Sequence, residues 1–326
     1  MNYRLLQAKF LIASAVAGLL AFQQPLFAQF PGLPTRDQTP LLQAYFIPAT
    51  IDDSGQRWSF SQSLYITNTY QIDRNSHENL VIDVENTRLD LQANYAQGDW
   101  RFNINVPLIQ NRSGFLDSTI IGWHDFFGLP QGGRDQAANN QLQLQYQQGG
   151  ETLVDINQAS SAVGDIQLAA GYALNNASQW WLGIEQSVSN DALISNQHTD
   201  VALWFQTRGQ ASSTFTPYGM LGLAWPGSGG AFDKRVKNQF VFGQLGTLYA
   251  WRADYQWLLQ ADYHSGMVQQ TRLDALTDSL QAQFGLRLPH IFDGHQMDIF
   301  FSEDIYPGHA PDITFGLRFS TAVSAH

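Results

Sequence analysis

Apolar and polar residues alternate along most of this chain, in runs of about ten positions. Between positions 100 and 108 every second residue is apolar: Trp100, Phe102, Ile104, Val106 and Leu108. The places between them begin with polar residues: Arg101, Asn103 and Asn105. A period of two is typical of a β-strand, because successive side chains of a strand point to opposite faces.

The same alternation recurs often enough to predict an all-β protein. Residues 88–95 alternate like 100–108, and Gln97, Gly98 and Asp99 between the two segments predict a tight hairpin turn. Ten further segments follow the pattern, at 58–72, 165–174, 180–188, 200–208, 214–225, 238–252, 255–264, 280–288, 297–303 and 313–319. About twelve strands result, which is an even number, and each has the length of a tilted membrane-crossing strand.

The polar faces of these strands decide between a soluble sandwich and a membrane barrel. A soluble sheet exposes its polar face to water and normally carries many lysines and glutamates there. Here the polar positions hold mostly Gln, Asn, Ser, Thr, Gly and Arg, and the whole chain has three lysines, Lys9, Lys234 and Lys237. Charged residues make up 14% of the chain, against roughly 25% in an ordinary soluble domain.

Aromatic residues near the strand ends point in the same direction. They would form the girdles that mark the two membrane interfaces of a barrel, and they include Trp58, Tyr70, Tyr95, Trp100, Trp180, Trp181, Trp225, Trp251 and Tyr255. We therefore predict an antiparallel up-and-down transmembrane β-barrel of about twelve strands. A soluble all-β fold is the alternative.

The amino terminus has the features of a secretory signal peptide. Arg4 and Lys9 precede an apolar stretch at 10–22, and Ala28 offers a small residue for cleavage. A membrane anchor is the alternative, although the apolar stretch is shorter than the ~20 residues of a spanning helix. We predict export with residues 1–28 removed.

The remaining chain divides into a barrel and irregular parts. Residues 29–57 form a Pro-rich N-terminal extension, either periplasmic or lumenal, and the barrel occupies 58–320. Residues 109–164 are a long inserted loop that either lies outside the barrel or partly fills it. A short tail, 321–326, follows a last strand whose Phe319 suits recognition by the barrel-assembly machinery.

Composition excludes several other functions. The net charge of -11 argues against a nucleic-acid-binding surface. The chain has no cysteine, which excludes disulfides, thiolate metal sites and cysteine nucleophiles.

The long insertion carries a pattern that resembles a known family. Its segments are 105–108, 113–117 and 122–134, and residues 36–41 fit the same family's start. They resemble an uncharacterised proteobacterial outer-membrane family, defined by domain of unknown function 3187, over nearly the whole mature chain. The resemblance implies an exported barrel and no activity. Its motif loop comprises Trp123, His124, Asp125, Phe126, Gly128, Leu129, Pro130, Gly132, Gly133 and Arg134.

The motif loop invites a catalytic interpretation, which the sequence does not favour. His124 and Asp125 near Ser113 and Ser118 could form a hydrolase site, but adjacent side chains diverge and no Gly-x-Ser-x-Gly elbow is present. We expect instead that Trp123 and the following phenylalanines, Phe126 and Phe127, pack the loop.

Two weaker motifs are also interpreted structurally. The glycines of 128–134 lack the Lys-Ser/Thr end of a phosphate loop and predict a turn. His290 and His295 flank Asp293 and could bind zinc, yet turn histidines are usually solvated. We predict no catalytic residue, no metal and no cofactor.

The inward faces of the strands carry the remaining chemistry. They would either form a charged constriction that selects solutes or a network of ion pairs that closes a narrow barrel. Twelve strands leave less room than the 16–18 of an aqueous porin, which favours the ion pairs. The lumen-lining candidates are Arg88, Asp90, Arg101, Glu185, Arg208, Asp262, Arg287 and Arg318.

These observations predict a non-enzymatic protein of the outer membrane. A narrow channel or transporter for small or amphipathic solutes follows from the architecture alone. A structural or surface-interaction barrel with a sealed lumen is the alternative, and an outer-membrane hydrolase that uses His124 comes third. The expected partners are outer-membrane lipids and the barrel-assembly machinery, with no nucleic acid.

Overall fold

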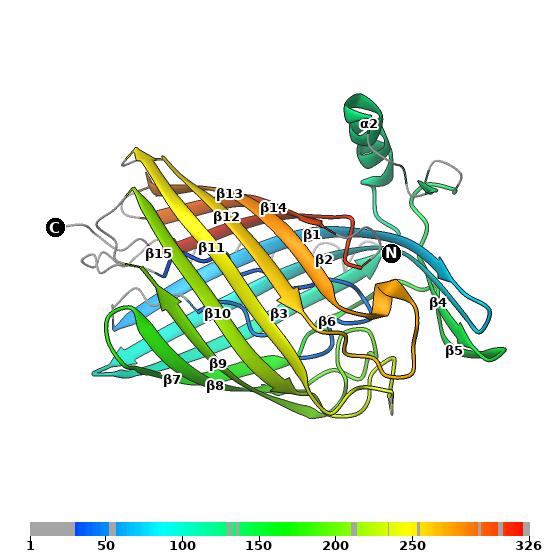
Figure 1. Ribbon diagram of the computed structural model, residues 1–326, viewed down its shortest axis with the longest axis horizontal. Helices are drawn as coiled ribbons and strands as arrows, with labels where there is room; N and C mark the ends of the chain where they lie inside the picture. The colour runs from blue at the N-terminus through cyan, green and yellow to red at the C-terminus, as the bar shows by residue number, and fades with distance from the viewer. Residues whose placement is uncertain are drawn as a thin grey trace, which may run out of the picture.

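Twelve antiparallel strands close into a barrel in the computed structural model (Figure 1). The structure describes residues 30–51, 57–128, 131, 133–134, 137–209, 214–233, 235–252, 255–292, 295–305 and 309–321. The barrel strands are β1 (Trp58–Arg74), β2 (Glu78–Gln97), β3 (Trp100–Arg112), β7 (Ile166–Ala173), β8 (Ser178–Gln186), β9 (Thr199–Arg208), β10 (Phe215–Trp225), β11 (Phe240–Arg252), β12 (Tyr255–His264), β13 (Ser279–Phe292), β14 (His295–Asp304) and β15 (Ile313–Thr321). Each strand pairs with its neighbours in chain order, β3 pairs with β7, and β1 closes the ring with β15. The predicted transmembrane up-and-down barrel of about twelve strands is confirmed.

The register of the strands separates an apolar outer face from a polar inner face. One row of paired residues is apolar and faces outward: Ile299, Leu317, Leu64, Leu89 and Leu108. The adjacent row faces inward and is polar: Arg287, Asp298, Arg318, Ser63 and Asp90. Since the two rows are one position apart, a slip of one residue would exchange the faces. The alternation along the chain therefore fixes this register.

Aromatic rings gather around one end of the barrel on its outer face. Trp58 lies 4.6 Å from Tyr95 between ring centroids, and Trp100 lies 5.3 Å from Tyr172. Further around the ring, Phe215 lies 4.7 Å from Tyr249. Rings with one apolar side and one polar edge suit the boundary between lipid and water. This belt marks a membrane interface of the barrel.

The two ends of the barrel differ in the length of their connections. At one end of the barrel, called the turn end, short connections such as 98–99 and 174–177 join neighbouring strands, and β1 begins and β15 ends there. At the loop end, connections at 187–198, 226–239 and 265–278 are longer. A 3-10 helix, Asp274–Leu276, belongs to the last of these.

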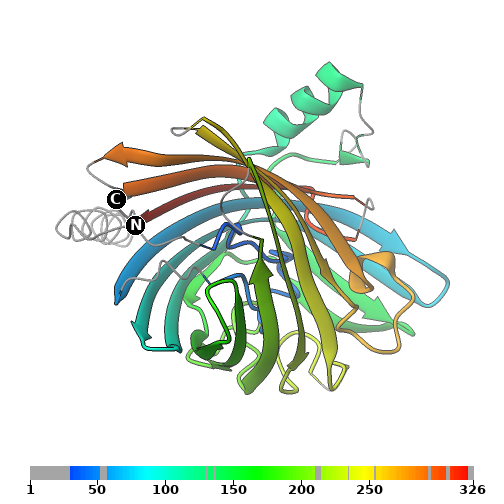
Figure 2. The same cartoon turned by 60° about the vertical axis from the view of Figure 1, so that its left-hand side comes forward.

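The long insertion lies outside the lumen. It holds α2 (Asp117–Phe127), β4 (Gln143–Gln148), β5 (Glu151–Ile156) and β6 (Ser160–Val163). β4 pairs with the first residues of β2, and β5 pairs with β4. β6 pairs with the last residues of β3. The insertion thus extends the wall beyond the loop end, and α2 stands outside the ring of strands (Figures 1 and 2). Of the two placements expected for this segment, its described residues take the one outside the lumen, and they form a helix and short strands in addition to loops.

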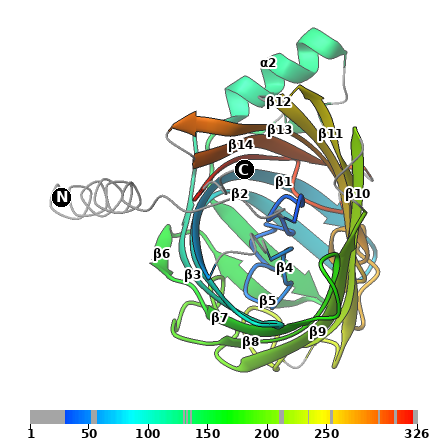
Figure 3. The ribbon, with the colours of Figure 1, turned by 90° about the vertical axis from the view of Figure 1, so that its left-hand side faces the viewer.

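The lumen is occupied by the N-terminal extension instead. Residues 30–51, called the lumenal segment below, run inside the ring of strands, where the dark-blue trace lies in Figure 3. Every residue of this segment is buried. A barrel of eight strands can be filled by side chains alone, whereas wider barrels leave space. Twelve strands therefore need extra chain, and the lumenal segment supplies it.

A glycine makes room for an aromatic ring inside the wall. A Cβ atom at Gly316 would lie 2.0 Å from the Phe300 ring, which packs with Phe30 and Leu33 of the lumenal segment. We predict that Gly316→Ala lowers the heat resistance of the folded barrel, because overpacking costs about 1–3 kcal/mol. Boiled and unboiled samples compared by gel mobility over a temperature series measure this effect.

Gly219→Ala is the control, since its Cβ would approach no atom closer than 3.3 Å. Equal heat resistance in the two variants would contradict the packing described here.

Candidate functional site in the barrel lumen

The lumenal segment rises from the turn end to the loop end and returns. Near its start, Arg318 donates to the carbonyl of Gly32 from the turn-end part of β15. Its far point is Tyr45, whose hydroxyl donates to the carbonyl of Gly229 in a loop-end connection at 2.8 Å. It then returns to Ile51, which contacts Gln206 near the turn end of β9. The segment thus spans most of the lumen as a hairpin-shaped insert.

A local turn reverses the segment. The Oδ1 atom of Asp37 accepts the N–H of Thr39 at 2.7 Å, and the carbonyl of Thr39 accepts the N–H groups of Leu42 and Gln43. An Asp side chain that binds the backbone two residues on is a common way to start a turn. The sequence 36–41 therefore folds back without any help from a glycine.

Wall glutamines take the place of a neighbouring strand for the lumenal segment. Gln260 accepts the N–H of Leu33 at 2.9 Å and donates to its carbonyl at 3.3 Å. Gln206 binds Ile51 in the same way, accepting its N–H at 3.3 Å and donating to its carbonyl at 3.0 Å. A glutamine carries both a donor and an acceptor, so one side chain satisfies both backbone groups of a residue.

Further backbone carbonyls of the segment accept hydrogen bonds from the wall. Arg287 donates to Pro31 at 3.0 Å, and Gln244 donates to Thr35 at 2.9 Å. A buried backbone group without a partner is unfavourable. The polar inner faces of β9, β11, β12, β13 and β15 therefore hold this particular chain in place.

A buried aspartate joins two arginines where the segment enters. Asp298 of β14 binds Arg287 of β13 at 2.9 Å and Arg318 of β15 on its other side. The three residues are direct neighbours across the strands and are fully buried. The same two guanidinium groups reach the carbonyls of Pro31 and Gly32. This triad thus connects the wall to the segment.

A second charged group lies two strands from Arg318 in the same row of inward residues. Asp90 of β2 binds Arg88 of the same strand at 2.7 Å and Arg36 of the lumenal segment at 2.8 Å. Nearer the loop end, the Nε2 atom of His264 donates to Asp37 at 2.9 Å, and Thr35 donates to Asp262 at 2.7 Å. Ionisable side chains of the wall therefore contact three consecutive residues of the segment.

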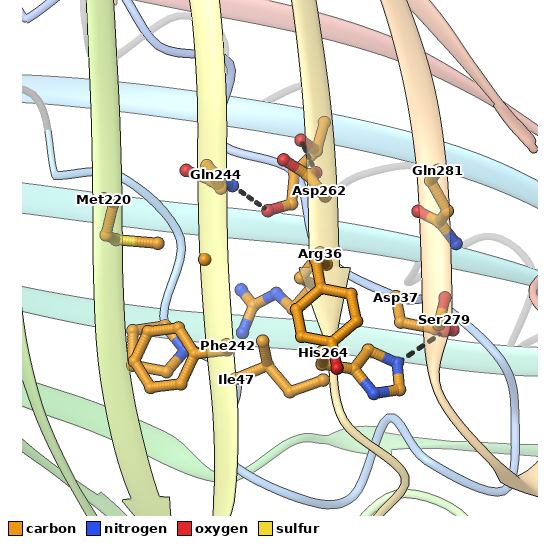
Figure 4. A pocket seen from close by; sticks show the side chains of 14 residues that line it. Arg36, Asp37, Ile47, Met220, Phe242, Gln244, Asp262, His264, Ser279 and Gln281 are labelled. Atoms are coloured by element: carbon orange, nitrogen blue, oxygen red, sulfur yellow. Dashed lines mark hydrogen bonds and ion pairs between the residues drawn. The ribbon is translucent and has the colours of Figure 1, made fainter.

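Little open space is left beside the segment. A cavity of about 20 Å³ lies between Thr35, Arg36 and Asp37 of the segment and the inner faces of β10 to β13 (Figure 4). This volume holds about one water molecule. Between the segment and this part of the wall, the structure therefore leaves space for little more than one water molecule.

Apolar clusters close the lumen above and below the charged groups. Phe30 and Leu33 pack with Tyr218, Leu258 and Phe300. Toward the loop end, the segment packs with side chains from the strands, the insertion and the loops, including Leu41, Leu42, Tyr45, Phe46, Leu80, Tyr146, Phe232 and Leu276. The loop end is therefore covered by an apolar core.

The structure separates the predicted lumen residues into two groups. Arg101 and Arg208 occupy inward-facing positions, but both lie at the turn end of the barrel. There they donate to the turn carbonyls of Gly98 and Asn176. The others are buried inside the barrel: Arg88, Asp90, Glu185, Asp262, Arg287 and Arg318.

Several residues of the site were missed by the sequence analysis. Asp298 lies on the same polar face of its strand as Gln296 and Ser302. The alternation of apolar and polar residues was therefore enough to identify it as an inward residue. The roles of Arg36, Asp37, His264 and Gln260 had no sequence signal, because they depend on where the N-terminal extension lies.

The motif loop forms a separate site outside the lumen. Arg134 is buried and binds Asp117, the first residue of α2, and Asp312 of the β14–β15 connection. Its guanidinium carbon also lies 4.8 Å from the centre of the Tyr70 ring. Gly128 ends α2 with a φ of 67°, a left-handed conformation that favours glycine. The arginine thus fixes the insertion to the barrel.

Two of the motif aromatics that were expected to pack the loop have exposed side chains. Trp123 is 52% exposed and Phe126 is 82% exposed. The Nδ1 atom of His124 has no hydrogen-bond partner in the described chain, so the site shows no base that is oriented by Asp125. Leu129, Pro130 and Gly132 lie outside the described residues.

The described residues contain neither a metal site nor a membrane-spanning helix. No group of three or more His, Asp or Glu side chains there could hold a metal ion. No helix among those residues is long and apolar enough to cross a membrane.

Comparison with known proteins establishes the family. The family model described as "Protein of unknown function (DUF3187)" matches residues 27–321, and the chain belongs to this family. No curated protein matches the sequence.

Solved structures resemble the barrel at low sequence identity. The COG4313 outer membrane channel from Pseudomonas putida F1 is similar with a TM-score of 0.54 and 10% identity, over 86% of this chain and 98% of that one. The toluene transporter TodX of P. putida has a TM-score of 0.41 and 11% identity, over 83% and 91% of the two chains. The first shows a common fold, and the second is too distant to support an argument.

Mutation of Asp298 tests whether its triad with Arg287 and Arg318 stabilises the barrel. We predict that Asp298→Ala destabilises the barrel by about 3–5 kcal/mol, because it leaves two buried arginines without their counter-ion. The temperature at which the fast-migrating folded band disappears from gels measures the change.

Asp155→Asn serves as the control, since Asp155 is exposed on β5. A barrel of unchanged heat resistance after Asp298→Ala would show that the triad does not hold the wall and the lumenal segment together.

Proposed function

We propose that this DUF3187 protein is a gated channel of the outer membrane, closed by its own lumenal segment. The observation that carries the proposal is the way the lumen is filled. Residues 30–51 enter as one continuous chain and are bound mainly by side chains, whereas the wall is joined by strand-to-strand ladders. A filler of this kind can leave while the wall stays intact.

The two sets of contacts differ in strength. Each wall strand is paired on both sides along most of its length, and the closed ring has no free edge. The lumenal segment has scattered hydrogen bonds, two main charged contacts and two apolar clusters. Displacing the segment therefore costs less free energy than opening the wall.

The orientation follows from the ends of the barrel. Outer-membrane barrels have short periplasmic turns and long extracellular loops, so the turn end faces the periplasm. The exported chain would lose residues 1–28, and the last strand would present Phe319 to the barrel-assembly machinery. The apolar outer face would then contact outer-membrane lipids.

A protein of similar fold also supports a channel role without enzymatic activity. The COG4313 protein of similar fold is an outer membrane channel. The motif loop offers no oriented base at His124. Passage of small solutes suits the lumen better than passage of large ones, because twelve strands enclose less space than a 16-stranded porin.

A sealed structural barrel is the second candidate. The small cavity beside the lumenal segment and the apolar core at the loop end favour it, since both close the passage. The two candidates differ in what happens once the segment is loosened.

Conductance in planar bilayers separates them. Gln260→Ala removes both hydrogen bonds to Leu33 and leaves buried groups unpaired, at a cost of about 1–3 kcal/mol. We predict that this change raises the open fraction by roughly one to two powers of ten. A chain without residues 30–51 that still folds should conduct continuously.

Gln296→Ala is the matched control, because Gln296 is buried on the inner face of β14 and its described bonds go to Asp298. If heat-modifiable, folded Gln260→Ala protein and the deletion both fail to conduct, the lumen is sealed and the channel proposal is wrong.

A further inference from the structure

The lumenal segment is bound very differently on its two sides. The strands β11 to β15, called the second arc, bind it through Gln244, Gln260, His264, Arg287 and Arg318. The strands β2, β3, β7 and β8, called the first arc, lie across the ring from them in the strand order. The first arc contributes fewer bonds, and several of its polar atoms have no partner.

Polar atoms without a partner lie on two surfaces that face each other, the inner face of the first arc and the lumenal segment. On the inner face of the first arc they are Asn86 Oδ1, Arg88 Nη2, Asn105 Oδ1 and Glu185 Oε2. On the lumenal segment they are Arg36 Nε and both amide atoms of Gln38. All six residues are buried. We call them the polar seam. In the described part of the second arc, the corresponding atoms are Gln244 Oε1 and Ser320 Oγ.

Hydrogen bonds and ion pairs bring the members of the polar seam together. Arg36 and Arg88 share Asp90, and Asn86 donates to the carbonyl of Gln38 at 2.7 Å. On the other side, Asn105 and Glu185 are joined through Gln167, with distances of 3.1 and 2.6 Å. Gln92, which follows Asp90 on the inner face of β2, is paired with Asn105 of β3. The seam thus runs from the lumenal segment across β2 and β3 to β8.

Buried polar atoms of this kind normally bind water. Nearly all buried polar groups in proteins have a partner in the chain or an ordered water molecule. An apolar void stays dry, whereas a site with several donors and acceptors holds water. The seam offers amide and carboxylate acceptors beside guanidinium donors, which is the chemistry of a hydrated surface.

The turn end of the seam opens toward solvent. Along β2, Asp90 is fully buried, whereas the next inward residues, Gln92 and Asn94, are partly exposed. Asn94 binds Asn103 of β3 and Ser59 of β1, so the mouth is lined by neutral polar groups. A row of polar side chains thus leads from the turn end toward the seam.

We propose that the polar seam is a hydrated site for small hydrophilic solutes and is the side of the lumen along which they pass when the channel opens. This inference rests on the proposed channel function and specifies its substrate class. Solutes with hydrogen-bonding groups exchange seam water for contacts with Arg88, Asn105 and Glu185. Apolar solutes gain nothing there, because they would leave those groups without partners.

Cysteine labelling tests this placement in the intact protein, which has no cysteine of its own. Asn105→Cys and Gln38→Cys place a thiol in the seam. Ser302→Cys and Gln281→Cys place one on the buried inner face of the second arc. We predict that a membrane-impermeant methanethiosulfonate reagent modifies the seam thiols about tenfold or more faster, because a hydrated thiol ionises and can be reached.

Conductance measurements then test whether solutes pass along the polar seam. In the Gln260→Ala background, modification at position 105 should reduce conductance and the uptake of small sugars into liposomes by at least half, and modification at position 302 should not. Equal labelling rates on the two arcs, or faster labelling of the second arc, would overturn the proposal. So would seam labelling that leaves conductance unchanged.

The same experiment separates this proposal from the channel function. If the Gln260→Ala barrel conducts but the seam thiols are unreactive, the passage lies elsewhere and the channel stands. If the seam thiols react and no folded variant conducts, the lumen is sealed, and both the channel and the route are wrong.

Discussion

The hydrogen-bonding needs of one extended chain inside the barrel determine much of this structure. Residues 30–51 have no neighbouring strand, and their backbone groups would be costly to bury alone. Gln260 and Gln206 each bind both backbone groups of one residue, and Arg287 and Arg318 cover the first carbonyls. The polar inner face is thus shaped to hold this segment, and its composition follows from that requirement.

The charged residues serve the same purpose. Asp298 neutralises two arginines that also reach the segment, and Asp90 neutralises Arg88 together with the segment's own Arg36. In a narrow lumen, unpaired charges would be unfavourable, whereas paired ones fix the position of the chain. The ion pairs therefore close the lumen by binding a filler, and they do not form a bare charged constriction.

Sequence patterns were sufficient for the wall and insufficient for what fills it. A period of two identifies each strand and its inward residues, because every strand is amphipathic by itself. The position of residues 30–51 depends on contacts with distant strands, which no local pattern encodes. The helix α2 was missed because Thr119, Ile120 and Ile121 favour a strand locally, while Gly128 and the Arg134–Asp117 pair stabilise the helix.

The proposed gate requires that the lumenal segment can leave a stable wall. Hydrogen exchange, measured by mass spectrometry on the protein in lipid nanodiscs, shows whether it can. We predict that amides of residues 30–51 exchange through a separate opening, faster than those of β1, β12 and β13, while the strands stay protected. Exchange of the segment only together with the strands would contradict it, and would make the segment a permanent core of the barrel.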